Sequence, residues 1–410
     1  MQCMCRRSKQ PIFLKMAEKD MEKKSIAFVM DTMAVGGVEK ALIELLKAFD
    51  YSRYNVTLWL KNDSGPLHNQ IDTRVKIEYW ECKNTRDTLL KQLKQGKLIS
   101  FFRGAFYRIF SRIHLSEYDL NAFYSVKSLP QCSDHCYDCV IAYQVLSPAV
   151  VANALYRFRG LKKVLWVHGR NVRPQSLNVF FDKEYCKFDL IACVSESTRT
   201  EFSHDFPKAK KKTAVFYNLL SSHKIKEQCE EQLNSELRNI SIVTVGRLVS
   251  VKGQAMVPQT TRLLLDAGYD VYWYLVGDGG LRETVEAEIR KYDVGEHVIL
   301  LGTQMNPYPY IKNCDIYVQP SFSEGYCTTT MEAKILRKPV VTTDAPGMRE
   351  QFVSGENGLI VDGMTPQALF EGIRTLLDHP ELREKFIENL SHEVCDNSGE
   401  LQKLYDFIES

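Results

Sequence analysis

Two glutamates eight residues apart, Glu324 and Glu332, flank a turn that precedes a predicted helix. Ionised carboxylates are good acceptors for sugar hydroxyls and poor ligands for phosphate. The start of the helix between them offers unpaired N–H groups and a partial positive charge, which favour a phosphate. The pattern therefore predicts a site for sugar hydroxyls on either side of a bound diphosphate.

A second charged pair, Arg247 and Lys252, lies five residues apart directly after the predicted strand Ile240–Arg247. Arginine can grip a phosphate through two parallel N–H groups, and lysine acts as a compact positive charge. Both side chains can reach one diphosphate from a single strand-to-helix loop. A charged surface loop is the alternative interpretation of the same residues.

The elements that must position these residues are strand, loop, helix and strand in turn. A buried strand is predicted at residues 315–319 and the next strand at residues 339–343. The predicted helix between them carries Glu332. In open parallel sheets, ligands bind at the carboxyl ends of the strands. Near the start of the chain, Gly36 and Gly37 separate the predicted strand 25–31 from the helix 38–47, and such a turn permits close backbone approach to a ligand.

The string P-S-x-x-E-G, the E-x7-E spacing and the later P-V-V and N-G-L-I-V together resemble the retaining glycosyltransferases of family 4. The resemblance is strongest over 240–362 and weaker before residue 162. It implies an α/β chain with the GT-B fold, in which two doubly wound, Rossmann-like domains face each other across a cleft. Cys327 departs from the glycine that many relatives have at this position.

The resemblance also implies the activity. A hexose would pass, with retention of configuration, from a nucleotide-sugar donor to a sugar acceptor that is lipid-linked or a growing polysaccharide. The implied catalytic residues are Glu324, His168, Arg247 and Lys252. The implied donor-binding residues are Gly36, Gly37, Glu39, Gly325, Tyr326, Cys327, Thr328 and Glu332. With Asp-x-Asp absent, we expect no metal and no cofactor besides the nucleotide-sugar substrate.

The bulk composition narrows the functional classes. The chain has 410 residues, 44% hydrophobic and 25% charged, with a formal net charge of +2. Length argues for two or three domains, and the near-neutral charge gives no reason to expect nucleic acid as a partner. The P-loop pattern G-x-x-x-x-G-K-[ST] and the serine-hydrolase elbow G-x-S-x-G are both absent. The sequence shows no secretory signal or apolar run of membrane-spanning length, so we expect a cytoplasmic protein.

Twelve scattered cysteines fit free thiols in a reducing compartment. Cys132, Cys136 and Cys139 form C-x3-C-x2-C, a spacing that resembles the iron–sulfur loop of radical S-adenosylmethionine enzymes. Asp138 stands where those enzymes have an aromatic residue. Free thiols are therefore the favoured interpretation.

The segment from Lys91 to Leu115 alternates aromatic or aliphatic with basic residues and contains no acidic residue. Such segments bind anionic membrane surfaces, and a helix packed on the sheet with its basic face in water is the other interpretation. The resemblance favours docking at the inner face of the cell membrane.

We predict an N-terminal extension, 1–24, that is poorly ordered, followed by an acceptor-side domain, 25–220. A nucleotide-sugar-binding domain, 221–384, comes next, and a C-terminal helix, 385–410, is expected to return to the first domain. Two alternatives stay open for the activity: a non-catalytic GT-B partner subunit and a GT-B sugar-nucleotide epimerase.

Overall fold

The computed structural model describes residues 23–80, 118–127, 129–169, 175–233, 236–238, 240–395 and 397–410. Most of the predicted extension 1–24 and all of the basic segment 91–115 lie outside these residues. No helix in the described part of the chain is long and apolar enough to cross a membrane.

The first half of the chain forms a seven-stranded sheet with all neighbouring strands parallel, in the order β3-β2-β1-β4-β5-β6-β7. Its central strands are apolar on both faces, as expected for a parallel sheet covered by helices on both sides. The strands are β1 Lys24–Val29, β2 Tyr54–Leu60, β3 Lys76–Tyr79, β4 Cys136–Ala142, β5 Arg159–Val167, β6 Leu190–Cys193 and β7 Thr213–Val215.

The second half forms a six-stranded parallel sheet in the order β10-β9-β8-β11-β12-β13. In both sheets the strand order reverses beside the first strand of the unit, which marks the ligand-binding crevice of doubly wound folds. The strands are β8 Ser241–Val245, β9 Tyr272–Val276, β10 Val298–Gly302, β11 Ile316–Gln319, β12 Val340–Thr343 and β13 Leu359–Val361.

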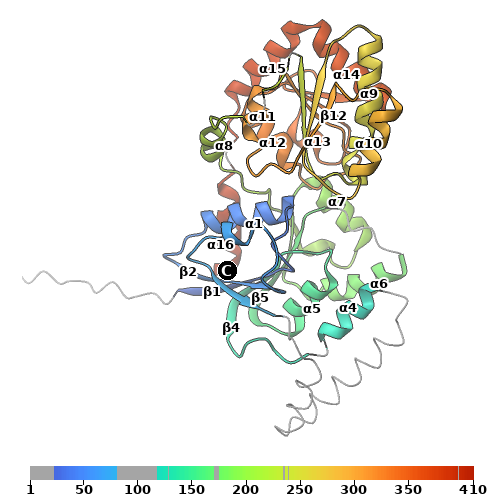
Figure 1. The fold of residues 1–410 in the computed structure, drawn as a ribbon. Helices are drawn as coiled ribbons and strands as arrows, with labels where there is room; N and C mark the ends of the chain where they lie inside the picture. Colours follow the sequence, from blue (N-terminus) through green and yellow to red (C-terminus); the bar gives the residue numbers. More distant parts are fainter. Residues whose placement is uncertain are drawn as a thin grey trace, which may run out of the picture.

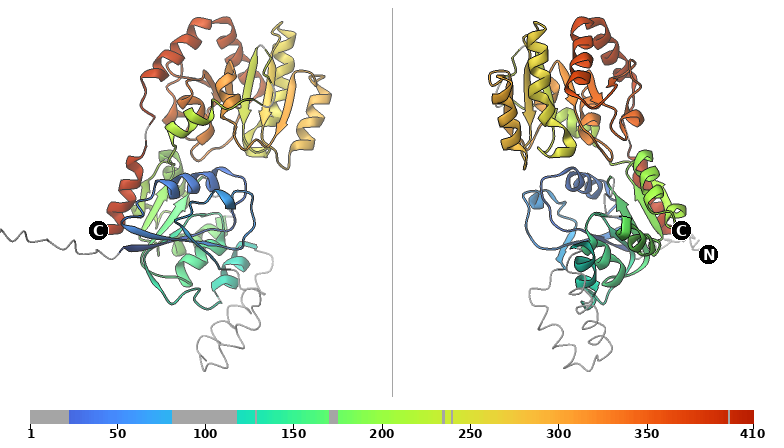
Figure 2. Two further views of the ribbon diagram at one scale, coloured as in Figure 1. Left: turned by 60° about the vertical axis from the view of Figure 1, so that its left-hand side comes forward. Right: turned by 90° about the vertical axis from the view of Figure 1, so that its right-hand side faces the viewer.

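Helices cover both faces of each sheet (Figures 1 and 2). On the first sheet, α1 Gly37–Ala48 packs on one face. The other face carries α4 Tyr118–Lys127, α5 Pro148–Tyr156, α6 Gln175–Tyr185 and α7 Glu196–Asp205. On the second sheet, one face carries α9 Val257–Asp266, α10 Arg282–Lys291, α14 Pro366–Asp378 and α15 Pro380–His392. The remaining helices of this half are α8 Ser222–Gln228, α11 Tyr308–Asn313, α12 Thr328–Ile335 and α13 Met348–Gln351.

The last helix, α16 Gly399–Glu409, packs on the first sheet although the chain has already passed through the second. Leu404 is fully buried there, and the ring of Tyr405 stacks on Tyr54 with centroids 4.8 Å apart. The Tyr405 hydroxyl also accepts a hydrogen bond from the Asp50 N–H at 2.7 Å. The chain therefore crosses between the two halves twice.

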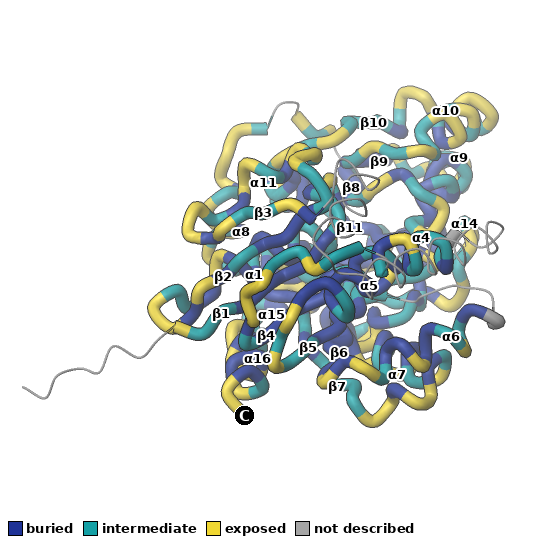
Figure 3. Tube along the Cα trace, turned by 90° about the horizontal axis from the view of Figure 1, so that it is seen from below, coloured by how far each residue is buried: buried dark blue, intermediate teal, exposed yellow. Residues whose placement is uncertain are grey.

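Short 3-10 turns complete the described part, at His68–Gln70, Lys210–Lys212, Ser250–Lys252 and Gln254–Met256. The central strands of both sheets are buried, whereas the edge strands β3, β7 and β10 are partly exposed (Figure 3). Two doubly wound α/β domains confirm the fold class predicted from the sequence. The domain boundaries at 24, 220 and 384 stay a prediction. Residue 24 is the first of β1, 220 lies in the connection between β7 and α8, and 384 lies within α15.

Candidate active site

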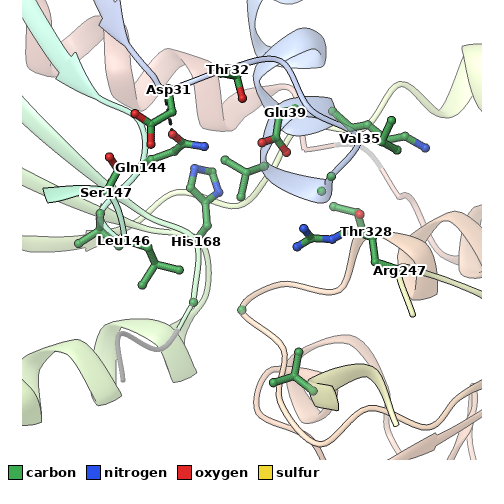
Figure 4. Close-up of a pocket in the computed structure, with 18 of the residues that line it drawn as sticks. Asp31, Thr32, Val35, Glu39, Gln144, Leu146, Ser147, His168, Arg247 and Thr328 are labelled. Atoms are coloured by element: carbon green, nitrogen blue, oxygen red, sulfur yellow. Dashed lines mark hydrogen bonds between the residues drawn. The ribbon is translucent and has the colours of Figure 1, made fainter. Parts of the chain in front are cut away.

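A cavity of about 1190 Å³ lies between the two domains, at the carboxyl ends of their central strands. The first sheet contributes residues that follow β1, β4 and β5, and the second contributes residues that follow β8, β9 and β11. Every site residue predicted from the sequence, except Cys327, lines this cavity. Figure 4 shows the two walls facing each other, with His168 and Glu39 opposite Arg247 and Thr328.

On the second-domain wall, Lys252 and Glu324 form an ion pair, with the Lys252 Nζ 2.7 and 2.8 Å from the two carboxylate oxygens. The Ser321 hydroxyl donates a third hydrogen bond to this carboxylate at 2.6 Å. Burial lowers the pKa of Lys252, but the neighbouring Glu324 carboxylate outweighs this and holds it above its ordinary value. The lysine predicted to bind diphosphate and the glutamate predicted to bind sugar thus neutralise each other in this structure.

The loop that carries Arg247 and Lys252 is held against β11 by a glycine. Gly253 has φ of +69°, and a Cβ atom there would overlap the carbonyl oxygen of Pro320. The Gln254 side-chain amide donates to the Arg247 carbonyl at 3.0 Å and closes the loop from the other side. These contacts bring Lys252 within reach of Glu324, although 72 residues separate them in the chain.

The N-terminus of α12 reaches the cavity through Gly325 and Thr328. A Cβ atom at Gly325 would overlap the His168 carbonyl oxygen of the first domain. The Ser195 hydroxyl, also of the first domain, donates to the Gly325 carbonyl at 2.6 Å. The loop before α12 is therefore both a wall of the cavity and a point where the domains touch.

The Cys327 side chain packs away from the cavity, beside Ala345 and Met348, and is only 2% exposed. Burial raises the pKa of its thiol to about 11, so the thiol is neutral. The predicted contact between Cys327 and the nucleotide-sugar donor stays a prediction, and only the backbone of Cys327 could make it.

Glu332 is 4% exposed and lines the cavity from α12. Burial raises the pKa of its carboxyl group to about 7, against the opposing charge of Lys40 and a hydrogen bond from Tyr308. Its Oε2 atom has no hydrogen-bond partner among the described residues. A buried acceptor oxygen of this kind needs a donor, and a ligand hydroxyl can supply it.

On the first-domain wall, α1 begins at Gly37 with Gly36 as its N-cap, and the Glu39 carboxylate lies against Gly36. Burial raises the pKa of Glu39, and the positive charge of Arg247 across the cavity opposes the increase. Glu39 therefore interacts electrostatically with Arg247, which the sequence predicts to bind phosphate in the other domain.

His168 follows β5 and packs its ring on that of Tyr143, with centroids 4.6 Å apart. Burial lowers the pKa of His168 to about 3, despite a hydrogen bond to the backbone of Tyr143. The imidazole is therefore neutral, and its Nε2 atom has no hydrogen-bond partner among the described residues. It can serve a ligand as a hydrogen-bonding group but not as a cation.

The second domain matches a known family. Residues 225–392 match the family model described as glycosyl transferases group 1. This region is a group 1 glycosyl transferase domain.

Two curated relatives are similar over part of the chain. One is the N-acetylgalactosamine-N,N'-diacetylbacillosaminyl-diphospho-undecaprenol 4-alpha-N-acetylgalactosaminyltransferase of Campylobacter jejuni, 30% identical over 203 residues, or 49% of this chain and 54% of that protein. Another is the capsular polysaccharide biosynthesis glycosyltransferase CapM of Staphylococcus aureus, 27% identical over 238 residues, or 55% of this chain and 61% of CapM. The chain thus spans little more than half the length of these relatives.

Among solved structures, HepE of Anabaena in complex with UDP superposes with a TM-score of 0.68 at 19% identity. The match covers 94% of this chain and 99% of HepE, so it includes both domains. At this identity the match establishes the fold, and it confirms the predicted GT-B arrangement.

The group 1 glycosyl transferase domain contains the ion pair of Lys252 and Glu324 as well as Arg247 and Glu332. The opposite wall of the cavity lies outside the matched residues. Three polar residues on that wall, Asp31, Gln144 and Ser147, were not predicted from the sequence. They follow β1 and β4 and match no motif, so only their place after predicted strands could have pointed to them.

Within the described residues, no group of three or more His, Cys, Asp or Glu side chains is placed to hold a metal ion. The C-x3-C-x2-C residues are free thiols, with Cys139 buried in β4 and Cys136 exposed. That the group 1 glycosyl transferase domain works without a metal stays a prediction.

Proposed function

We propose that this protein is a glycosyltransferase that moves a hexose, with retention, from a nucleotide-diphosphate sugar to a hydroxyl group of a sugar acceptor. One observation carries the proposal. Arg247, Lys252 and the N-terminus of α12 converge with Glu324 and Glu332 on one cavity between two doubly wound domains. The group 1 match of the second domain supports the same reaction class.

In this reaction the acceptor oxygen bonds to the anomeric carbon, and the bond from that carbon to the diphosphate oxygen breaks. The electron pair leaves with the diphosphate, whose negative charge increases, and the acceptor proton is released. Positive groups fixed beside the diphosphate stabilise the transition state more than the bound donor. Arg247, Lys252 and the helix N-terminus are such groups, and they supply the neutralisation that a metal supplies elsewhere.

The ion pair between Lys252 and Glu324 gives this site a resting arrangement. Both side chains are largely withdrawn from water, with exposed fractions of 22% and 7%. We expect the donor to divide the pair, with the diphosphate drawing the ammonium group and the hexose hydroxyls donating to the carboxylate. Each charge keeps a partner throughout, which avoids the cost of a buried unpaired charge.

The orphan acceptor atom of Glu332 suits the ribose hydroxyls of the nucleotide. The neutral imidazole of His168 can hydrogen-bond to the hexose from the opposite wall. Glu39 lies on the first-domain wall, and a tight turn at Gly36 and Gly37 lets the backbone approach the donor. These roles follow the resemblance and the positions of the residues together.

We propose a lipid-linked sugar or a growing polysaccharide as the acceptor class, since the names of the two curated relatives concern a diphospho-undecaprenol substrate and capsular polysaccharide. Peripheral attachment to an anionic membrane through the segment from Lys91 to Leu115 belongs to the same proposal. Its basic residues would each contribute about 1 kcal/mol near such a surface.

The experiment is a nucleotide-sugar screen. Thermal unfolding is followed with UDP, GDP and ADP sugars, and acceptor-free hydrolysis of each sugar is measured in parallel. We expect one nucleotide to raise the melting temperature and its sugar to be hydrolysed slowly. Binding without hydrolysis or transfer would favour the non-catalytic partner subunit, and release of an epimerised sugar would favour the epimerase.

A further inference from the structure

We propose that Asp31, Gln144 and Ser147 bind a hydroxyl group of the acceptor sugar and position it for transfer. This inference rests on the proposed glycosyltransferase function and adds residues for its second substrate. All three side chains line the cavity on the first-domain wall, opposite Arg247 and Thr328 (Figure 4). The three residues are called the acceptor cluster below.

The topology of the first sheet brings the acceptor cluster together. Strands β1 and β4 are parallel neighbours, with Val29 beside Ala142, so the residues that follow them emerge side by side. The Asp31 N–H donates to the Gln144 Oε1 atom at 3.0 Å. The Ser147 hydroxyl hydrogen-bonds to the Asp31 carboxylate and also accepts from the Val150 N–H as the N-cap of α5. The cluster is thus held in place by backbone contacts before any ligand arrives.

The chemistry of the cluster selects a hydroxyl group. Burial raises the pKa of Asp31, while the Ser147 hydrogen bond and the charge of Lys61 oppose the increase. A partly buried carboxylate gains a donor when a sugar hydroxyl enters, and it repels phosphate. The amide of Gln144 adds donor capacity beside this acceptor, and a hydroxyl group can both donate and accept. A sugar with free hydroxyls therefore fits the cluster better than an anionic head group.

The position of the cluster assigns it to the acceptor rather than the donor. Asp31 interacts electrostatically with Glu39, and Glu39 interacts with Arg247 across the cavity. The cluster therefore borders the place where the diphosphate and hexose are proposed to bind, from the opposite domain. A hydroxyl held there faces the sugar that is to be transferred.

Apolar residues also line the cavity on the side of the first domain. They are Trp80, Val126, Leu129 and Leu146, of which Leu146 is 61% exposed. An apolar group attached to the acceptor sugar could cover the exposed side chain of Leu146 and remove its surface from water. Hexyl glycosides, which join a sugar to a short hydrocarbon chain, are therefore suitable probes.

The test separates the two substrates. Wild type and Asp31→Ala are assayed with hexyl glycosides of glucose, galactose, N-acetylglucosamine and N-acetylgalactosamine, using whichever nucleotide sugar wild type hydrolyses. We expect Asp31→Ala to raise the acceptor KM at least about tenfold, the loss expected for a hydrogen bond to a charged group. Nucleotide affinity and acceptor-free hydrolysis should stay within twofold of wild type. Ser147→Ala removes a hydrogen bond to the Asp31 carboxylate and the N-cap of α5, so it should raise the acceptor KM less and also lower the melting temperature.

The matched control is Asp138→Asn. Asp138 holds the opposite end of β1, where its carboxylate accepts from the Ser25 N–H at 2.7 Å and from the Ser25 hydroxyl at 3.0 Å. The Asp138→Asn variant should have a lower melting temperature and an unchanged acceptor KM. This control distinguishes the effect of Asp31→Ala on the acceptor from a general loss of stability.

An unchanged acceptor KM in Asp31→Ala would overturn the inference, and so would an equal loss of nucleotide affinity. Nucleotide-loaded wild type that binds none of the four glycosides would overturn it as well. A wild-type protein that binds no nucleotide sugar would instead contradict the proposed function, so the two failures can be told apart.

Discussion

The two walls of the cavity are built in different ways. On the second-domain wall, charged residues come in close sequence pairs. Arg247 and Lys252 share one loop, Glu324 and Glu332 lie on a second loop and the helix that follows it, and a buried ion pair joins the two loops. On the first-domain wall, polar residues follow two neighbouring strands, β1 and β4, and are brought together by the fold. The first arrangement suits a diphosphate, which is the same in every nucleotide sugar. The second can change one residue at a time, which suits an acceptor that differs between transferases.

The largest expected effect concerns the ion pair of the second-domain wall. We expect Lys252→Ala to lower transfer by about 10²–10³-fold, as found when one fixed group that stabilises transition-state charge is removed. It should also cost on the order of 3–5 kcal/mol of stability, because it leaves the Glu324 carboxylate buried without its cation. Steady-state kinetics and urea unfolding measure the two effects.

The double variant Lys252→Ala with Glu324→Gln separates these effects. Removing both charges should restore most of the stability and none of the activity. The control is Lys385→Ala, which breaks an exposed ion pair with Glu356 in the same domain and should cost less than about 1 kcal/mol. Activity recovered in the double variant would show that the lysine acts only on stability.

The contact between the walls gives the next prediction. In Gly325→Ala the new methyl group would overlap the His168 carbonyl oxygen, so the domains could not approach as they do here. We expect transfer to fall by at least about 10²-fold, since small displacements of reacting groups are costly. Nucleotide affinity should fall less than transfer, because Arg247 and Lys252 of the proposed diphosphate site lie on another loop of the second domain.

Small-angle X-ray scattering should show a larger radius of gyration for Gly325→Ala than for wild type. Gly280→Ala is the matched control, because a Cβ atom at Gly280 meets nothing within 4 Å. Equal activity in the two alanine variants would mean that catalysis does not need this approach of the domains.

These contacts also show what the sequence could and could not predict. The strand predicted at 315–319 is β11, Ile316–Gln319, and the helix after it carries Glu332, because both are local patterns of apolar and polar residues. Arg247 and Lys252 were recognisable because one loop holds both. The pairing of Lys252 with Glu324 was not, since it depends on Gly253 packing beneath Pro320 in another segment.

The acceptor cluster marks the same limit on the other wall. Asp31 and Gln144 are 113 residues apart and meet only because β1 and β4 are neighbours. Strand order is a property of the whole sheet, and it produces no characteristic spacing of residues along the sequence. Chemistry contained in one loop was therefore predictable, and chemistry assembled across strands was not.

Glu332 allows a pH test of the second-domain wall. Its pKa in the folded protein, about 7, lies above the ordinary value of 4.5. At a pH between these two values the folded state therefore keeps a proton that the unfolded state has released. The stability from this group is complete below pH 4.5 and lost as the pH rises through about 7. We expect a loss on the order of 3 kcal/mol, which Glu332→Gln should abolish.

Urea unfolding across this pH range measures the stability effect, with Glu356→Gln as an exposed control in the same domain. Ribose hydroxyls should favour the ionised carboxylate, so wild type should bind UDP-glucose more tightly at about pH 8 than at about pH 6, and Glu332→Gln should not. The charge of the diphosphate in UDP-glucose does not change in this pH range. A pH-independent affinity in wild type would remove Glu332 from the donor site.

The smallest effect is expected where the walls are joined outside the cavity. The Glu350 carboxylate of the second domain accepts the N–H groups of Glu196 and Ser197, each at 2.8 Å, in the first turn of α7 in the first domain. A negative charge at a helix N-terminus contributes about 0.3–1 kcal/mol at an exposed site. That energy corresponds to about a two- to fivefold change in the population of the closed arrangement.

Transfer by Glu350→Gln should fall by this factor and recover partly at high nucleotide-sugar concentration, since the donor also favours closure. Glu356→Gln, whose carboxylate pairs only within its own domain, should leave transfer unchanged, and equal rates for the two variants would mean that α7 does not help to hold the walls together.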